Sequence, residues 1–335
     1  MFNSSNFLNV IKTIWHITLL PLWGGLWAFG LGVLAWYPLR WWPGDQWVVV
    51  RLINYFVPWL LLGLLPGLLL AVWGRRYSLA ALLLLPILLI ILTYAPLFTP
   101  RPATALAADG SLKVMSYNIW GRNRTLDQAV ELIKAEQADI VLLQEDYRQV
   151  SPKIHDQLTN LYPDGQLYLV YEPAIGQAVI SRYPITRLDA SYAQGRTQKV
   201  LVDTPGGEVE VWNVHTHAPN DWTGQYRQIT ALVRELPKVE RPLIVGGDFN
   251  TTDQSETYQF ITQYLRNAHW ESGWGFGFSF PAHSPRFKRI PIITPMVRID
   301  HIFYNSYFYA TAAQTLSESG GSDHFPITAN LMMVP

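Results

Sequence analysis

The first hundred residues contain three long stretches without a single Asp, Glu, Lys or Arg. They run from Thr13 to Leu39, from Leu52 to Gly74 and from Tyr77 to Pro100, with 27, 23 and 24 residues. A helix of about 20 apolar residues crosses the hydrocarbon core of a bilayer. Buried helices of soluble proteins rarely stay uncharged for so long, and a cleaved signal peptide would explain only one of the three. The sequence therefore predicts three transmembrane helices in a membrane anchor of residues 1–100.

The charges between these stretches predict their orientation. Lys12 precedes the first stretch, and Arg75 and Arg76 separate the second from the third, whereas the Pro38–Arg51 connection carries two Arg and one Asp. Cationic residues favour the cytoplasmic side of a membrane. We therefore expect a multi-pass protein of the cell membrane with a cytoplasmic amino terminus and an extracytoplasmic domain after residue 100. Five Trp and Tyr residues between Trp36 and Trp47 are expected at the outer interface.

The neutral total charge averages two unlike halves. The chain has 25 basic and 25 acidic residues, but residues 1–100 hold five basic residues and one acidic residue. The remainder therefore holds 20 basic and 24 acidic residues, a net charge of −4. Nucleic-acid binding depends largely on cationic contacts, so this balance makes a nucleic-acid partner less favoured. The absence of cysteine excludes disulfides and Cys-ligated zinc or iron–sulfur sites.

A Pro- and Ala-rich linker of residues 101–111 joins the anchor to residues 112–335, which have the pattern of an α/β domain. Ala105-Leu106-Ala107 has the form of a signal-peptidase site, so cleavage that releases the domain near Ala107 is an alternative to permanent anchoring. Short apolar segments alternate with helical ones, which indicates two packed sheets with helices outside them. The predicted strands are 112–117, 140–143, 179–181, 200–203, 208–215, 243–245, 298–304 and 326–332, and the predicted helices are 125–136, 225–236 and 255–265. Thr125 and Gln128 have the spacing of a capping box.

Polar side chains that could carry chemistry stand at the ends of these strands. Each has a structural explanation alone, as a helix cap, a turn residue or a buried histidine. Together they supply hard oxygen ligands that suit Mg²⁺ or Mn²⁺ and His–Asp pairs that can transfer protons. The combination predicts metal-assisted attack of water on a phosphate ester. These candidates are Asn118, Glu145, His215, His217, Asp248, Asn250, Asp300, Asp323 and His324.

Six short motifs in this order resemble the endonuclease/exonuclease/phosphatase superfamily, over about residues 113–331. The resemblance implies the DNase I-like fold, an α/β/β/α sandwich of four layers, which agrees with the strand pattern. The motifs are Ser116-Tyr117-Asn118-Ile119, Leu143-Gln144-Glu145, Asn213-Val214-His215, Gly247-Asp248-Phe249-Asn250, Arg298-Ile299-Asp300-His301-Ile302 and Ser322-Asp323-His324.

The resemblance also implies a metal site. Glu145, with Asn118 nearby, is expected to be the principal ligand of Mg²⁺ or Mn²⁺. Asp323 is expected near the metal or the attacking water.

The same resemblance implies the catalytic roles. Asp248 would orient or deprotonate the attacking water, and Asn250 would contact the scissile phosphate. His324 would contact phosphate while Asp300 orients it, and His215 would stabilise charge on the phosphate. His301 is expected to take no part in catalysis, and His217 is an additional candidate.

Three functions remain open at this stage. The predicted anchor, and a similarity in architecture to a membrane-bound branch that includes teicoplanin-resistance proteins, favour hydrolysis of a membrane lipid or lipid-linked phosphate. An extracytoplasmic nuclease is the alternative, and a non-catalytic binding module on the same fold is the third. The aromatic run within Trp270–Lys288 is either packed on the domain or a substrate loop, in which Arg286, Lys288 and Arg289 would meet anionic phosphate.

Overall fold

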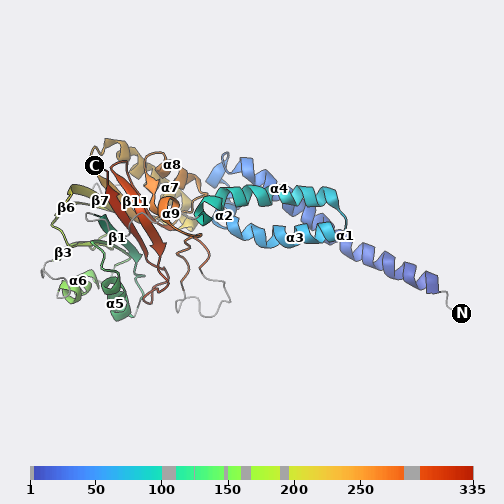
Figure 1. The fold of residues 1–335 in the computed structure, drawn as a ribbon, viewed down its shortest axis with the longest axis horizontal. Coiled ribbons are helices and arrows are strands. Elements are labelled where there is room, and N and C mark those ends of the chain that lie inside the picture. Colours follow the sequence, from blue (N-terminus) through green and yellow to red (C-terminus); the bar gives the residue numbers. More distant parts are fainter. Residues whose placement is uncertain are drawn as a thin grey trace. The chain divides into compact units, whose positions relative to one another are not determined.

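A computed structural model of the chain describes residues 4–99, 111–123, 125–146, 150–159, 167–188, 196–282 and 295–334. The chain forms two compact units, Met1–Ala95 and Pro96–Pro335, and each has its own core. The first unit is helical and the second contains two β-sheets (Figure 1). Ala107 and most of the predicted linker lie outside the described residues.

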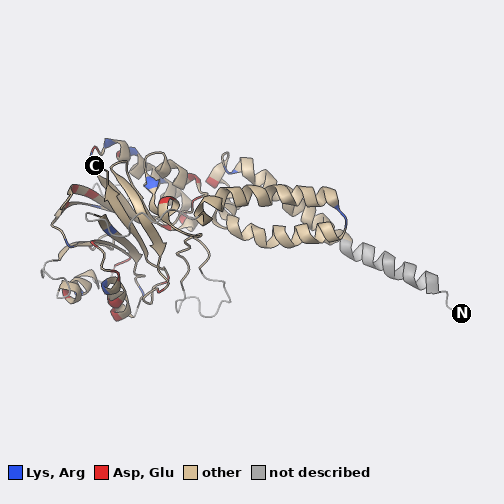
Figure 2. Ribbon diagram, viewed as in Figure 1, with Lys and Arg blue, Asp and Glu red and all other residues tan. Residues whose placement is uncertain are grey.

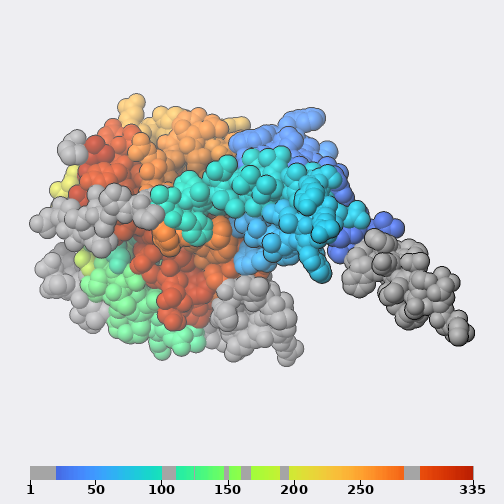
Figure 3. All heavy atoms as spheres, turned by 45° about the vertical axis from the view of Figure 1, so that its right-hand side comes forward, coloured from blue at the N-terminus to red at the C-terminus, as the bar shows by residue number. Residues whose placement is uncertain are grey.

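Over its described residues, 4–95, the first unit consists of four α-helices and short 3₁₀ turns. Helices α1, α3 and α4 pack side by side, with α3 and α4 antiparallel across a short connection (Figures 1 and 3). Two glycines of α3 allow its close approach to α1. A Cβ atom at Gly63 would lie 2.8 Å from the Phe29 ring, and one at Gly67 would lie 2.8 Å from the Leu26 side chain. The elements are α1 (Ser4–Leu39), η1 (Gly44–Gln46), α2 (Val48–Tyr55), η2 (Val57–Leu60), α3 (Leu61–Trp73) and α4 (Tyr77–Tyr94). The turn η3 (Ala95–Phe98) follows at the boundary to the second unit.

Among the residues that the structure describes, two helical segments are long and apolar enough to cross a membrane, Leu20–Leu39 and Tyr77–Phe98. The second predicted helix is broken, because α2 and the segment Val57–Trp73 meet at an angle of 85°. Pro58 is the second residue of η2 and has no N–H to continue the previous helix. The bent pair counts as a third span only if both parts are taken together, so three crossings stay a prediction. Figure 2 shows the long helices almost without charged residues and Arg at the α3–α4 connection.

A buried polar cluster holds the bend against the end of α1. The indole Nε1 of Trp36 donates to Asn54 Oδ1 at 2.8 Å, and Asn54 Nδ2 donates to Asp45 Oδ1 at 2.7 Å. Arg51 Nη1 donates to the Asp45 carbonyl oxygen at 2.9 Å. Asn54 therefore connects α1, η1 and α2 from one position that is 1% exposed.

Replacement of Asn54 by Leu should destabilise the first unit by roughly 1–3 kcal/mol, because it removes two hydrogen bonds at a buried position. Thermal unfolding of the full chain in detergent micelles would measure the loss. Leu52→Ala on the same helix is the control, since the Leu52 side chain is 56% exposed. An Asn54→Leu variant that unfolds at the wild-type temperature would contradict the assigned role.

The described part of the second unit forms two six-stranded mixed sheets. The first sheet has the order β11 (Phe308–Thr315), β12 (Ile327–Met333), β1 (Ser111–Asn118), β2 (Ile140–Gln144), β4 (Gln177–Ser181) and β3 (Tyr168–Glu172). The second sheet has the order β5 (Ile185–Arg187), β6 (Thr197–Thr204), β7 (Gly207–His215), β8 (Leu243–Asp248), β10 (Asp300–Tyr304) and β9 (Arg266–Asn267). The helices are α5 (Leu126–Glu136), α6 (Val150–Thr159), α7 (Trp222–Glu235), α8 (Glu256–Thr262) and α9 (Ala268–Ser272).

The two sheets and the helices on their outer faces form four layers, as the alternation of side chains along the strands shows. In β1, Val114 joins the core between the sheets, whereas Tyr117 joins a separate core with α5 and α6. In β7, Val211 faces the core between the sheets, and Trp212 packs with α7 and α8. Each strand thus covers two cores because its side chains alternate with period two. The α/β/β/α sandwich predicted from the sequence is confirmed.

Most of the predicted strands are present, with ends that differ by a few residues. The predicted helix at 125–136 is α5, but Thr125 makes no capping hydrogen bond and donates through Oγ1 to Asn123 Oδ1 at 2.9 Å instead. The capping box is therefore wrong, although the helix is correct. Helices α6 and α9 and strands β3, β5, β9 and β11 were not predicted from the sequence.

Candidate active site

The predicted site residues meet at one edge of the sandwich because of the strand directions. The pair β1 and β2 is parallel, as is the pair β7 and β8, so four carboxyl ends point to the same edge. His215 and Asp248 end β7 and β8 and lie opposite each other in register. Strand β10 runs antiparallel to β8, which places its first residue, Asp300, beside Asp248. Asn118 ends β1, and Glu145 directly follows β2.

Several backbone positions at this edge have positive φ angles. Gly247 has φ +149°, and a Cβ atom there would lie 1.9 Å from the Val214 carbonyl oxygen. Only glycine fits this approach, which sets Asp248 next to the end of β7. Glu145 and Asn250 have φ +60° and +48°, a left-handed conformation uncommon for these residues. Such backbone strain gathers at functional sites.

Asn118 connects the two sheets through its side-chain amide. Its Nδ2 donates to Glu145 Oε1 at 3.3 Å and to Asp248 Oδ2 at 3.0 Å. Its Oδ1 accepts from the backbone N–H of Trp120 at 3.0 Å. Asn118 therefore acts here as a donor that positions two carboxylates, and its role as a metal ligand stays a prediction.

Asp300, His324 and Asp248 form a continuous buried series. Asp300 Oδ2 lies 2.9 Å from His324 Nδ1, and His324 Nε2 lies 3.7 Å from Asp248 Oδ2. Asp248 Oδ1 accepts from the backbone N–H of Asn250 at 2.9 Å. His215 completes the group, with its Nε2 3.9 Å from both Glu145 Oε1 and Asp248 Oδ2.

The protonation of these groups is set jointly. Burial alone would lower the pKa of His324, but the Asp300 and Asp248 carboxylates raise it to about 10. Burial raises the pKa of Asp248 to about 7, against the attraction of His324. Burial lowers the pKa of His215 to about 4. Near neutral pH the site therefore contains a cationic His324, a neutral His215 and an Asp248 able to accept a proton.

Glu145 differs from the others in its access to solvent. Its side chain is 28% exposed, whereas those of Asp248, Asp300 and His324 are buried. Although burial opposes ionisation, His215 and the Gly121 N–H lower the pKa of Glu145 below its usual value. A partly exposed, ionised carboxylate suits a divalent cation that keeps part of its water shell.

The donor set fits a hard divalent cation. Among the described residues, Asp248, Asp300 and His324 each offer one ligand atom within 4.8 Å of the others. This group differs from the predicted ligands Asn118, Glu145 and Asp323, whose roles stay predictions. Glu145 and the buried carboxylates together supply the oxygen ligands that Mg²⁺ or Mn²⁺ prefers.

The remaining candidates are placed as follows. Asp323 is buried and contributes to the raised pKa values of Tyr117 and His324. His217 lies beyond β7 and pairs with Asp221, with Nδ1 3.0 Å from Oδ2. Arg286, Lys288 and Arg289 lie outside the described residues.

One residue of the site was missed from the sequence. Ser279, which is fully buried, donates to Asp300 Oδ2 at 2.6 Å. It stands in a Gly- and Phe-rich run where nothing in the local pattern distinguishes it from a turn serine. Only the folded chain brings it to the His324–Asp300 pair.

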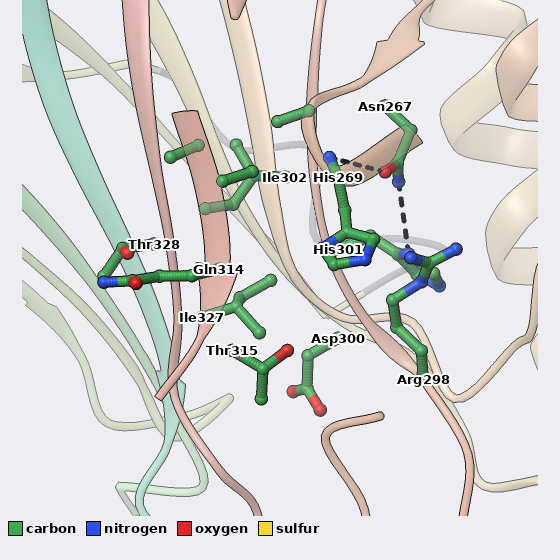
Figure 4. A pocket seen from close by; sticks show the side chains of 13 residues that line it. Asn267, His269, Arg298, Asp300, His301, Ile302, Gln314, Thr315, Ile327 and Thr328 are labelled. Atoms are coloured by element: carbon green, nitrogen blue, oxygen red, sulfur yellow. Dashed lines mark hydrogen bonds between the residues drawn. The ribbon is translucent and has the colours of Figure 1, made fainter. Parts of the chain in front are cut away.

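A small pocket lies between the sheets behind Asp300 (Figure 4). His301 faces Asn267 there, with its Nδ1 3.2 Å from Asn267 Nδ2 and its Nε2 2.9 Å from the Thr251 carbonyl oxygen. The carbonyl requires a proton on Nε2, and the Asn267 amide requires a bare Nδ1, so the ring is neutral. Burial, and then the Arg298 guanidinium, lower the pKa of His301 to about 3.

This histidine should make the protein sensitive to acid. The pKa of His301 is about 3 in the folded protein and about 6.5 in the unfolded chain. The folding stability that the neutral ring contributes is therefore complete above pH 6.5 and is lost as the pH falls toward 3. Between pH 7 and pH 5 the loss is roughly 2 kcal/mol. His301→Gln should therefore show a smaller drop in unfolding temperature from pH 7 to pH 5 than wild type. Equal drops in both proteins would refute this explanation.

Comparison with known proteins identifies the family. The model of the Endonuclease/Exonuclease/phosphatase family matches residues 115–324, which contain all of these site residues. The chain belongs to this family. Members are hydrolases, both phosphatases and nucleases, and they typically use a divalent metal.

Curated relatives extend the similarity beyond the family's core. A UPF0294 protein of Vibrio cholerae is 27% identical over 247 residues, which cover 68% of this chain and 80% of the relative. A UPF0294 protein of Vibrio vulnificus is 26% identical over 247 residues, covering 67% and 78%.

Solved structures support the fold. A family protein from Leptotrichia buccalis aligns with a TM-score of 0.53 and 17% identity, over 66% of this chain and all of that one. One from Bacteroides vulgatus aligns with a TM-score of 0.52 and 19% identity, over 67% and 99%.

Proposed function

We propose that the protein is a metal-dependent phosphoesterase that hydrolyses a membrane lipid or lipid-linked phosphate at the extracytoplasmic surface. The main support is the convergence of polar groups from both sheets at one edge. Asn118 and Glu145 come from one sheet, and His215, Asp248 and Asp300 from the other, with hydrogen bonds between them. A binding module would not need this arrangement of a base, a cationic histidine and carboxylates.

Each group has a distinct task in the proposed reaction. Asp248 accepts a proton from the attacking water as the water oxygen bonds to phosphorus. The bond from phosphorus to the leaving oxygen breaks, and that oxygen leaves with the bonding electron pair and takes its proton from solvent. Cationic His324, held by Asp300, faces the negative charge of the phosphate. Asn250 orients the phosphate, and neutral His215 donates a hydrogen bond to it.

The expected metal is Mg²⁺ or Mn²⁺. Glu145, together with Asn118, Asp323 or the neighbouring carboxylates, would hold it. When bound, it would supply positive charge for the phosphate oxygens.

The membrane part of the proposal rests on chain continuity. Phe98 is the last residue of the apolar segment Tyr77–Phe98. Within the second unit its ring lies 6.1 Å from the Trp274 ring and 5.0 Å from that of Phe276. The Trp274 side chain is 63% exposed beside this contact. An exposed Trp suits the interfacial layer of a membrane.

Nuclease activity is the alternative within the family. The net charge of −4 after residue 100 opposes a nucleic-acid substrate. Figure 2 shows Lys and Arg of the second unit dispersed among Asp and Glu in this view. A phosphate carried by a lipid needs no such cationic surface, because the membrane itself concentrates the substrate.

The full chain in detergent should release phosphate or headgroup from a lipid substrate with Mg²⁺ or Mn²⁺, and EDTA should abolish the release. The test panel is a polyprenyl pyrophosphate, sphingomyelin, an inositol phosphate and DNA.

Asp248→Asn should lower kcat by about 10²–10⁴-fold, because it removes the base. Glu145→Gln should raise the metal concentration needed, whereas Glu240→Gln, an exposed match, should change nothing. Cleavage of DNA alone would support the nuclease instead.

The predicted orientation can be tested with single cysteines, since the chain has none of its own. Lys238 and Arg75 are both exposed. Lys238→Cys should react with a membrane-impermeant maleimide in intact cells, whereas Arg75→Cys should react only after permeabilisation. The reverse pattern would place the second unit in the cytoplasm. Such a result would remove the extracytoplasmic substrate from the proposal.

A further inference from the structure

Ser279 makes a hydrogen bond that bears directly on the His324–Asp300 pair. Its Oγ donates to Asp300 Oδ2 at 2.6 Å, and this Asp300 oxygen also lies 2.9 Å from His324 Nδ1. The Ser279 Oγ in turn accepts from the backbone N–H groups of Ile299 and Asp300, both at 3.3 Å. The hydroxyl therefore has a fixed direction, with one donated and two accepted hydrogen bonds.

The backbone of Ser279 is held equally firmly. Its N–H donates to the Val297 carbonyl at 2.9 Å, and its carbonyl accepts from the Phe325 N–H at 2.8 Å. Phe325 directly follows His324. Ser279 thus bonds to Asp300 through its side chain and to the neighbour of His324 through its main chain.

The following residue adds a second contact to the same histidine. The Phe280 ring lies 4.8 Å from the His324 ring, at an interplanar angle of 46°. Two consecutive residues therefore restrict the His324 imidazole. Ser279 acts through Asp300, and the Phe280 ring packs against the imidazole itself.

The choice of carboxylate oxygen matters for the direction of the histidine. Asp300 has two oxygens, and rotation of its carboxylate would present either one to His324. The Ser279 hydroxyl ties Oδ2 in one position, so His324 Nδ1 meets an oriented acceptor and Nε2 points toward Asp248, 3.7 Å away. Loss of a hydrogen bond to a charged group leaves the acceptor freer and the histidine less oriented.

We propose that Ser279 is a positioning residue for the reaction, which acts by locking Asp300 so that Asp300 orients His324. This inference rests on the proposed phosphoesterase function. Ser279 is fully buried and reaches His324 through Asp300.

Ser279→Ala in the full-length protein should lower kcat by roughly ten- to a hundred-fold on whichever substrate of the panel above the wild-type protein cleaves, with KM within about two-fold. Ser279→Thr keeps the hydroxyl and should recover most of the activity. Ser272→Ala is the matched control, because the Ser272 hydroxyl donates to the Ala268 carbonyl at 3.0 Å, away from the pair. Unfolding temperatures of all variants would separate a loss of folding from a loss of orientation.

A double-mutant cycle makes the test specific. If Ser279 acts only through Asp300, then Ser279→Ala should cause no further loss in an Asp300→Ala background. Independent, multiplying losses would overturn the proposal. So would a Ser279→Ala variant that keeps full activity and wild-type stability.

A readout without substrate separates this inference from the proposed function. The imidazole N–H signals of histidine-labelled full-length protein in micelles would be recorded, with His324 assigned from its absence in His324→Gln. Ser279→Ala should move or broaden the His324 signal, whereas Ser272→Ala should not. If no substrate is cleaved but the signal moves, the positioning role stands and the proposed function fails. An unmoved His324 signal overturns the positioning role.

Discussion

The alignment of two parallel strand pairs is the constraint on which the site depends. Strands β1 and β2 in one sheet and β7 and β8 in the other all end at the same edge. A shift of one residue in the register of β8 would turn Asp248 to the opposite face and remove it from His215. The close approach at Gly247 opposes such a shift, since no side chain fits beneath the Val214 carbonyl. The chemistry therefore depends on backbone packing before it depends on any catalytic side chain.

Once the strand ends meet, the charges determine one another. Asp248 and Asp300 are both buried, and each would be unfavourable alone at such a position. His324 lies between them, and its positive charge stabilises both carboxylates. The two carboxylates in turn raise the pKa of His324, so the imidazole keeps its proton. Asn118 then adds hydrogen bonds to Asp248 and Glu145 from the other sheet. Removal of any one member would change the protonation of the rest, so these residues act as a unit.

Much of this site could be predicted from the sequence because its members follow strands in short, chemically distinctive motifs. The four layers could be predicted for a similar reason, since alternation in β1 and β7 reports two buried faces. Ser279 could not, because serine is common in loops and its partner Asp300 is 21 residues away. The bend after α2 was also missed, since Pro58 is compatible with a continuous membrane helix and the Trp36–Asn54–Asp45 contacts exist only after folding. Local pattern identifies what alternates or repeats, whereas contacts between distant residues need the tertiary structure.

The segment Trp274–Phe280 joins two environments that a lipid phosphate would need together. At one end, Trp274 and Phe276 contact Phe98, where the apolar segment finishes. The Phe276 and Phe278 rings then stack at 5.0 Å, and Phe280 lies against His324. The same segment therefore carries an aromatic cluster around Phe98 and, four residues after Phe276, a ring against His324. A soluble phosphate ester would leave the cluster unused, whereas an amphiphile has an apolar part for aromatic rings and a phosphate for the histidine. These rings on the segment that reaches His324 are the physical reason why we propose a lipid-linked substrate rather than a free one.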